Sequence, residues 1–211
     1  MSFVLPLNRL GARDLQPIAT NAAVHLCLDM QAMFGPDGPW PTPWMERVLP
    51  NVVRISEALA ERTVFTRFIP PAHADDMPGR WRDFYRKWQV VTRERIDPSC
   101  LRLVPELERF IPPAKLFDKT VYSAFADGRL ALRLADRRVN TLIVTGAETD
   151  VCVLSTVMSA VDYGFRTVLI TDAVCSSSDE GHDALMQMYS RRLDIQIELA
   201  GTREAIEALA G

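Results

Sequence analysis

Cys152 stands in a part of the sequence where a thiol can act as a nucleophile. An apolar, β-branched run at 140–144 precedes it, and a segment of helical pattern follows at about 151–163. This order predicts a strand, a tight polar turn and a cysteine at the start of a helix. Free backbone N–H groups and the helix dipole favour negative charge there, and so favour a thiolate. The alternative is a small, inert core residue, as most free cysteines are.

Two other side chains that can do chemistry follow predicted strands. Asp29 closes the apolar run 22–28, and Lys119, one of only three lysines, closes a short strand at 115–119. In open parallel sheets, ligands bind outside the carboxyl ends of the strands. We therefore expect Asp29, Lys119 and Cys152 to lie at one edge of a sheet. The alternatives are that Asp29 caps a helix and that Lys119 is a surface charge.

The composition is typical of a globular protein without nucleic-acid or membrane partners. The 211 residues suit one domain spanning 1–211, and 48% are hydrophobic and 24% charged. The net charge of -3 disfavours nucleic-acid binding. The four cysteines are far apart, which predicts neither a disulfide framework nor a zinc site. Residues 1–16 lack a secretory pattern and no apolar run approaches about 18 residues, so we expect a cytoplasmic protein.

Alternation of strand and helix patterns predicts an α/β fold. Strands are expected at 22–28, 63–69, 115–119, 140–145, 165–171 and 195–199. Helices are expected at 44–61, 107–111, 128–137, 151–163, 180–192 and 203–209. Pro50 should mark a break or the true first turn of the first of these helices. This pattern predicts a three-layer α/β/α domain with an open, mainly parallel six-stranded sheet.

The segment 70–98 is polar and rich in arginine, and it carries four aromatic residues at roughly helical spacing. They are Trp81, Phe84, Tyr85 and Trp88. Long excursions of this kind often close over a site. A lid and a contact with a partner subunit are both open interpretations of this segment.

The sequence resembles the isochorismatase-like cysteine hydrolases, which include nicotinamidases, N-carbamoylsarcosine amidohydrolase, biuret hydrolase and isochorismatase. The resemblance covers about 22–199 and rests on four motifs in the order and spacing of the family. The motifs are Leu28-Asp29-Met30-Gln31 with Phe34, Lys119 with Tyr122-Ser123-Ala124-Phe125, the run 146–153 with Thr156, and Thr171-Asp172-Ala173 with Ser176.

The resemblance implies a catalytic triad of Asp29, Lys119 and Cys152. Cys152 would attack a carbonyl carbon, Asp29 would carry the proton and activate water, and Lys119 would balance their charges. The family's oxyanion hole consists of backbone N–H groups, which correspond here to those of Glu148 and Cys152. The resemblance also implies a cis peptide bond between Ala147 and Glu148.

The implied activity is hydrolysis of a small amide or carbamoyl compound through a thioester, without a cofactor. Two alternatives stay open: an isochorismatase, which cleaves a vinyl ether and needs no cysteine nucleophile, and a non-catalytic binding protein on the same fold. The expected partners are a small-molecule substrate and, as in the family, further subunits in a homodimer or homotetramer. Aromatic residues are the candidates for the substrate pocket: Phe34, Trp40, Trp81, Tyr85 and Tyr122.

Two departures limit what the resemblance implies. Nicotinamidases bind a metal through an Asp-x-His motif and a further histidine after the second strand, whereas the corresponding region here lacks the motif and has one histidine, His73, near Asp75 and Asp76. We expect no metal, although a site formed by these three residues stays open. Glu148 replaces the small residue usual in nicotinamidases, so its side chain either faces the substrate or supports the turn.

Four other residues with reactive side chains have structural interpretations. Cys27 should pack within the sheet, and Cys175 either packs or lines the pocket. His25 lies inside a predicted strand and is expected to be a core histidine with satisfied hydrogen bonds. His182 stands at a predicted helix start, where a structural role is expected.

Overall fold

The computed structural model describes residues 15–210. The segment 1–14, most of the stretch assessed for a targeting signal, lies outside the described residues, as does 211 at the end of the predicted domain. No helix among the described residues has the length and apolarity to cross a bilayer.

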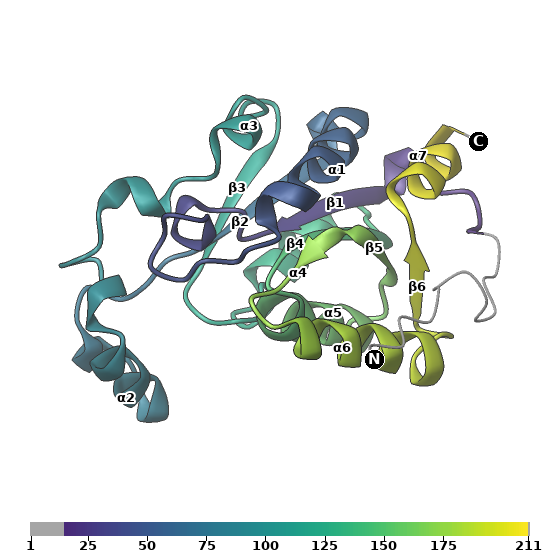
Figure 1. Ribbon diagram of the computed structural model, residues 1–211. Helices are drawn as coiled ribbons and strands as arrows, with labels where there is room; N and C mark the ends of the chain where they lie inside the picture. Colours follow the sequence, from purple (N-terminus) through teal and green to yellow (C-terminus); the bar gives the residue numbers. More distant parts are fainter. Residues whose placement is uncertain (1–14, 211) are drawn as a thin grey trace.

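An open sheet of six parallel strands forms the centre of the described structure (Figure 1). The strand order is β3-β2-β1-β4-β5-β6, so the sheet is wholly rather than mainly parallel. The strands are β1 (Ala23–Leu28), β2 (Thr63–Phe68), β3 (Lys115–Lys119), β4 (Thr141–Ala147), β5 (Arg166–Cys175) and β6 (Ile197–Ala200). The chain winds outward in both directions from β1 and β4, and this switch point is where such sheets bind ligands.

Helices cover both faces of the sheet, which gives the three-layer fold expected from the sequence (Figure 1). They are α1 (Met45–Ala58), α2 (Gly79–Lys87), α3 (Pro105–Glu108), α4 (Arg129–Asp136), α5 (Leu154–Asp162), α6 (Asp179–Arg192) and α7 (Thr202–Ala210). α1 and α7 pack on one face, and α4, α5 and α6 on the other. α2 stands away from the sheet at the end opposite α7 (Figure 1).

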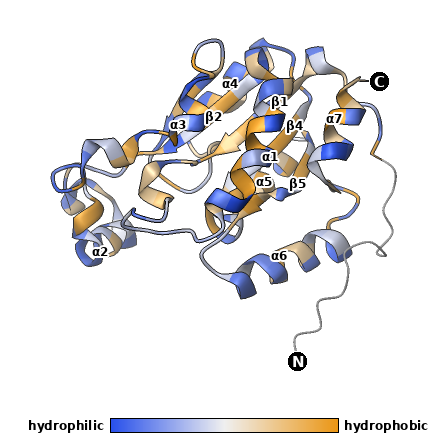
Figure 2. Ribbon diagram, turned by 45° about the horizontal axis from the view of Figure 1, so that its top comes forward, coloured by the Kyte–Doolittle hydropathy of each residue, from blue (hydrophilic) through white to orange (hydrophobic). Residues whose placement is uncertain are grey.

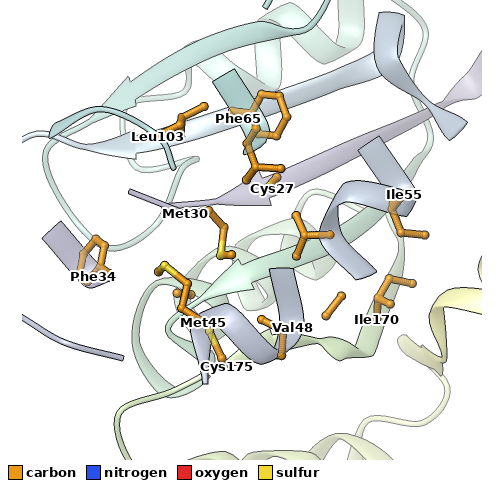
Figure 3. Close-up of a cluster of buried hydrophobic side chains, with 14 of the residues drawn as sticks. Cys27, Met30, Phe34, Met45, Val48, Ile55, Phe65, Leu103, Ile170 and Cys175 are labelled. Atoms are coloured by element: carbon orange, nitrogen blue, oxygen red, sulfur yellow. The ribbon is translucent and has the colours of Figure 1, made fainter. Parts of the chain in front are cut away.

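Each face of the sheet has its own hydrophobic core, because successive side chains of a strand point to opposite faces. In β1, Val24 and Leu26 join the core beneath α5, whereas Cys27 joins the one beneath α1. Figure 2 shows largely hydrophobic strands, with hydrophilic segments on α2 and α6. Figure 3 shows Cys27 and Cys175 among the side chains packed near α1. Cys27 therefore packs in the sheet as predicted, and so does Cys175.

Pro50 neither breaks α1 nor forms its first turn, contrary to expectation, because the helix begins at Met45. Proline lacks the N–H that would bond the carbonyl of Glu46. Both residues are exposed, so water can satisfy that carbonyl. The helix continues because Val52 and Ile55, one turn further, are fully buried against the sheet.

Other boundaries also differ from the predicted ones, including the helix expected at 107–111, where α3 runs Pro105–Glu108. β5 extends to Cys175, beyond the predicted end at 171, after a register shift against β4 between Val144 and Gly146. β6 begins at Ile197 rather than 195, since the chain after α6 first turns back through a bond from Gln196 N–H to the Leu193 carbonyl. The expected helix 151–163 begins as a π-helical turn, Thr149–Val153, before α5.

His25 is fully buried in β1 and its ring is bonded on both sides, as expected of a core histidine. Nδ1 lies 3.1 Å from Thr63 Oγ1 and Nε2 lies 2.8 Å from Thr145 Oγ1. Burial lowers the pKa of His25 from 6.5 to about 3, because the charged ring would lose its hydration. The folded protein therefore holds a neutral imidazole at this position above about pH 3.

This burial predicts an acid-sensitive contribution of His25 to stability. The unfolded chain takes up the proton below about pH 6.5, so the free energy of unfolding falls from there toward pH 3, by up to about 1.4 kcal/mol per pH unit. His25→Gln removes this proton uptake, so urea unfolding should show its stability deficit shrinking between pH 7 and pH 4.5. A deficit that stays constant over this range would contradict a neutral, buried His25.

Candidate active site

The strand order brings the three predicted triad residues together at the carboxyl edge of the sheet. Asp29 follows β1, Lys119 ends β3, and Cys152 follows β4. Lys119 Nζ lies 2.7 Å from Asp29 Oδ2 and 3.3 Å from Cys152 Sγ. All three side chains are buried, with Asp29 at 0%, Lys119 at 3% and Cys152 at 5% exposure. One ammonium group thus contacts both a carboxylate and a thiol, away from bulk water.

Asp29 is fixed by its backbone as well as by its carboxylate. Its φ of 49° lies in the left-handed region, which turns the chain directly after β1. Thr66, in the neighbouring strand β2, accepts a bond from the Asp29 N–H at 3.1 Å and donates to Oδ1 at 2.5 Å. The other oxygen, Oδ2, is left to face Lys119.

Lys119 meets three partners with its three ammonium protons. Besides Asp29 and Cys152, Nζ donates to the Val121 carbonyl at 3.1 Å, and it lies 5.0 Å from the centre of the Phe68 ring. Burial alone would lower the pKa of Lys119, but the charge of Asp29 and the hydrogen bonds to Asp29 and Cys152 outweigh it and raise the pKa. Lys119 is therefore a permanent cation whose donors are all used within the protein.

Cys152 lies in the π-helical turn that follows a close contact between two strands. Gly146 pairs with Leu28 of β1 and has φ 109°, and a Cβ at this position would overlap the Leu28 carbonyl oxygen. The peptide bond between Ala147 and Glu148 is cis. The Val153 N–H then bonds the Glu148 carbonyl at 3.0 Å, a π-type bond of the kind often found at functional sites.

The environment of Cys152 raises the pKa of its thiol, in contrast to the thiolate favoured by a helix start. Burial is the main cause, and the negative charge of Asp29 adds to it, whereas Lys119 acts in the opposite direction. The thiol is therefore protonated in the resting protein. Any nucleophilic role of Cys152 requires a base that removes the proton, and Asp29 shares the same ammonium partner.

The turn before Cys152 is bonded to the loop after β5 and to α6 by three successive side chains. Glu148 Oε1 accepts a bond from Ser177 N–H at 3.0 Å, and Thr149 Oγ1 lies 2.9 Å from His182 Nδ1. Asp150 Oδ1 accepts from Ser176 Oγ at 2.6 Å. These contacts explain the polar composition of the turn, and they give His182 the structural role expected of it.

A cavity of about 360 Å³ opens above Cys152. Its walls are mainly aromatic, from Phe34, Trp40, Phe68, Phe84, Trp88 and Tyr122. The remaining lining residues are Pro39, Pro41, Glu148, Val151, Cys152 and Ser177. A volume of this size suits a small molecule. Glu148 both supports the turn and lines the cavity, so both interpretations of its side chain apply.

The structure places three of the five candidate pocket residues, Phe34, Trp40 and Tyr122, in the cavity wall. Trp81 and Tyr85 are not among the lining residues. Trp81 packs against Tyr122, with ring centres 4.7 Å apart, and Tyr85 is fully buried beside Trp81. Both therefore lie behind the cavity wall, to which this group of four aromatic residues contributes only Phe84 and Trp88.

Several lining residues were not predicted. Phe84 and Trp88 share the helical spacing of Trp81 and Tyr85, and the sequence does not say which of the four face the cavity. Phe68 ends β2, and its position at the carboxyl edge was a usable signal. No local sequence pattern identified Pro39, Pro41 and Ser177 as lining residues, because only the tertiary fold brings them to the cavity.

The surroundings of His73 consist of protein hydrogen bonds. His73 Nδ1 lies 3.0 Å from Glu94 Oε2, and the backbone N–H of His73 donates to Asp76 Oδ2 at 2.9 Å. Asp75 is bonded by Arg86 at 2.9 Å. Within the part of the chain that the structure describes, no group of three or more histidine, cysteine or acidic side chains is arranged to hold a metal ion.

Comparison with known proteins identifies relatives among isochorismatase family proteins and amidases. The isochorismatase family protein PncA of Bacillus subtilis (strain 168) is 37% identical over 86 residues, which is 41% of this chain and 47% of that protein. N-carbamoylsarcosine amidase of an Arthrobacter species is 29% identical over 157 residues, 72% of this chain and 58% of that protein. The chain thus spans about half the length of these relatives.

A structural comparison supports the fold, and a family model points to the same family as these relatives. A cysteine hydrolase from Pseudomonas syringae pv. phaseolicola 1448A superposes with a TM-score of 0.79 at 23% identity, covering 92% of this chain and 95% of that one, a likeness of fold. The isochorismatase domain model matches residues 23–200, most of the sequence. The chain belongs to the isochorismatase family.

Proposed function

We propose that this protein is a cysteine-dependent amidohydrolase that cleaves a small amide or carbamoyl compound through a thioester, with Asp29, Lys119 and Cys152 as its triad. The observation that carries the proposal is the position of Lys119 Nζ, 2.7 Å from Asp29 and 3.3 Å from the Cys152 sulfur beneath a cavity. A protein that only bound a ligand on this fold would need no buried carboxylate beside a buried thiol, because burying charge is costly.

The acylation step begins from the protonated thiol. As Cys152 Sγ attacks the substrate carbonyl carbon, Asp29 accepts its proton, and Lys119 keeps the pair electrically balanced. The carbonyl oxygen becomes an oxyanion, which the backbone N–H groups of Glu148 and Cys152 stabilise. Asp29 then donates the proton to the substrate nitrogen, the C–N bond breaks, and ammonia or an amine leaves the thioester.

Deacylation repeats the same proton path. Asp29 removes a proton from water, the hydroxide oxygen attacks the thioester carbon, and the C–S bond breaks. The proton returns to the Cys152 sulfur, and the carboxylic or carbamic acid leaves. Lys119 stays protonated throughout, consistent with its raised pKa.

The thioester mechanism predicts that Cys152→Ala abolishes turnover. A panel of small amides, ureas and carbamoyl compounds, assayed for ammonia release, should give a substrate on which the variant is slower by at least about a thousandfold. Acid-quenched wild-type protein should carry the acyl group on Cys152, detected by mass spectrometry. Cys100→Ser, at a partly exposed cysteine outside the cavity, should retain full activity. Wild-type turnover by Cys152→Ala, with the fold intact, would exclude covalent catalysis.

The role of Asp29 predicts opposite effects on thiol acidity and on catalysis. Asp29→Asn keeps a side chain that tolerates positive φ and removes the charge that raises the Cys152 pKa. The pH profile of Cys152 alkylation by iodoacetamide should therefore move to lower pH by about one unit or more. Amide hydrolysis should nevertheless be lost, because the base is gone.

The matched control for this experiment is Asp194→Asn, which removes a carboxylate from an exposed position outside the cavity. It should change neither the alkylation profile nor the rate of hydrolysis. Retained hydrolysis in Asp29→Asn, or an alkylation profile that moves to higher pH, would assign the proton transfer to another group.

A further inference from the structure

The charges around the cavity bear on which amide it accepts, an inference that rests on the proposed function of the same site. Glu148 is the one side chain among the lining residues that is charged at neutral pH. Beneath it, the charges of Asp29 and Lys119 cancel as a close ion pair. The cavity therefore carries one net negative charge before a substrate enters.

The ammonium group of Lys119 is not available to bind a substrate carboxylate. Lys119 is 3% exposed, does not line the cavity, and directs its three protons to Asp29, Cys152 and the Val121 carbonyl. Lys87 contacts the Trp88 ring at 5.6 Å but is also absent from the lining residues. A substrate carboxylate would thus meet Glu148 without a compensating charge, which makes its desolvation costly.

The aromatic walls favour the opposite sign of charge. Trp40 lies at the centre of a cluster in which the ring centres of Phe34, Phe84 and Trp88 are 5.8–6.0 Å from its own. The faces of aromatic rings attract cations, and cages of such rings bind alkylammonium groups. Burial, with a contribution from the negative charge of Glu148, raises the pKa of Tyr122, another wall residue.

Glu148 can act on a ligand without giving up its structural bond. Oε1 accepts from Ser177 N–H at 3.0 Å, and Thr42 Oγ1 lies 3.5 Å from the same oxygen. A carboxylate has about four acceptor positions on its two oxygens, so capacity remains for a donor in the cavity.

We propose that the substrate is an amide whose far end carries a positively charged nitrogen and no carboxylate, held by the aromatic walls and by Glu148. Glu148 is then a specificity-determining residue. N-carbamoyl amino acids and the dianionic isochorismate would be rejected for the same electrostatic reason.

The proposal can be tested without a known substrate by two thiol reagents of similar size and opposite charge. Trimethylammonioethyl methanethiosulfonate is cationic and sulfonatoethyl methanethiosulfonate is anionic; both form a disulfide with Cys152 and release methanesulfinate. Rates are measured by mass spectrometry of the Cys152 peptide and divided by the rates with 2-mercaptoethanol. The corrected cation-to-anion ratio should exceed one in the wild type.

Glu148→Gln is the decisive variant, because its amide oxygen can still accept the Ser177 N–H bond. It should lower the corrected ratio by roughly tenfold, as expected from removing one charge at close range. Glu207→Gln makes the same change of charge at an exposed position on α7, outside the cavity, and should leave the ratio unchanged. A ratio below one in the wild type, or a ratio that Glu148→Gln leaves unchanged, would overturn the proposal.

Amides of matched length complete the experiment and separate this inference from the proposed function. The amides 5-aminopentanamide, hexanamide and adipamate share a chain of four methylene groups and end in a cation, a methyl group and a carboxylate. The wild type should give its highest kcat/KM with the cationic amide, and Glu148→Gln should remove that advantage over hexanamide. A preference for adipamate would overturn the charge assignment. Absence of hydrolysis throughout, with the reagent ratio as expected, would contradict only the proposed amidohydrolase.

Discussion

The buried ion pair between Lys119 and Asp29 is the interaction on which the rest of the site depends. Two charges that are almost completely removed from water are stable only when each meets enough partners, and removing one partner of such a pair costs about 3–5 kcal/mol. Thr66 and the Val121 carbonyl supply those partners from neighbouring segments. The pair therefore requires β1, β2 and β3 in their observed order, and it places an ammonium group beside the Cys152 sulfur.

The backbone around β4 imposes the second constraint. Gly146 lets β4 approach Leu28 more closely than a side chain would permit, directly before the chain turns at Asp29. The same strand end leads through Glu148 into the turn that carries Cys152. The Asp29 carboxylate and the Cys152 thiol are thus positioned by two adjacent, closely packed strand ends. Their separation depends on the sheet itself more than on the flexibility of a loop.

The sequence predicted the layers, the strands and the meeting of the triad residues because these follow from local patterns and from one rule about parallel sheets. A run of buried residues before Asp29, and another before the turn to Cys152, is visible in the sequence. The cavity wall was predicted only in part. The spacing of Trp81 and Trp88 does not indicate which of them faces the cavity; in the structure Trp88 lines it, whereas Trp81 packs on Tyr122. The state of the thiol was also beyond the sequence, because burial outweighs the favourable effect of a helix start.

The raised pKa of Cys152 limits the reactivity of the thiol in the absence of a substrate. The carboxylate of Asp29 raises the thiol pKa, and in the mechanism proposed above the same carboxylate receives the proton when the sulfur attacks a carbonyl carbon. A thiolate formed only during attack exposes little nucleophile to oxidants or stray electrophiles, since reactivity follows thiolate content. In that mechanism Lys119 balances either partner in turn, the carboxylate before proton transfer and the sulfur after it, since its ammonium group contacts both. Proton transfer within the pair therefore leaves the net charge of the buried site unchanged, which avoids a second desolvation cost.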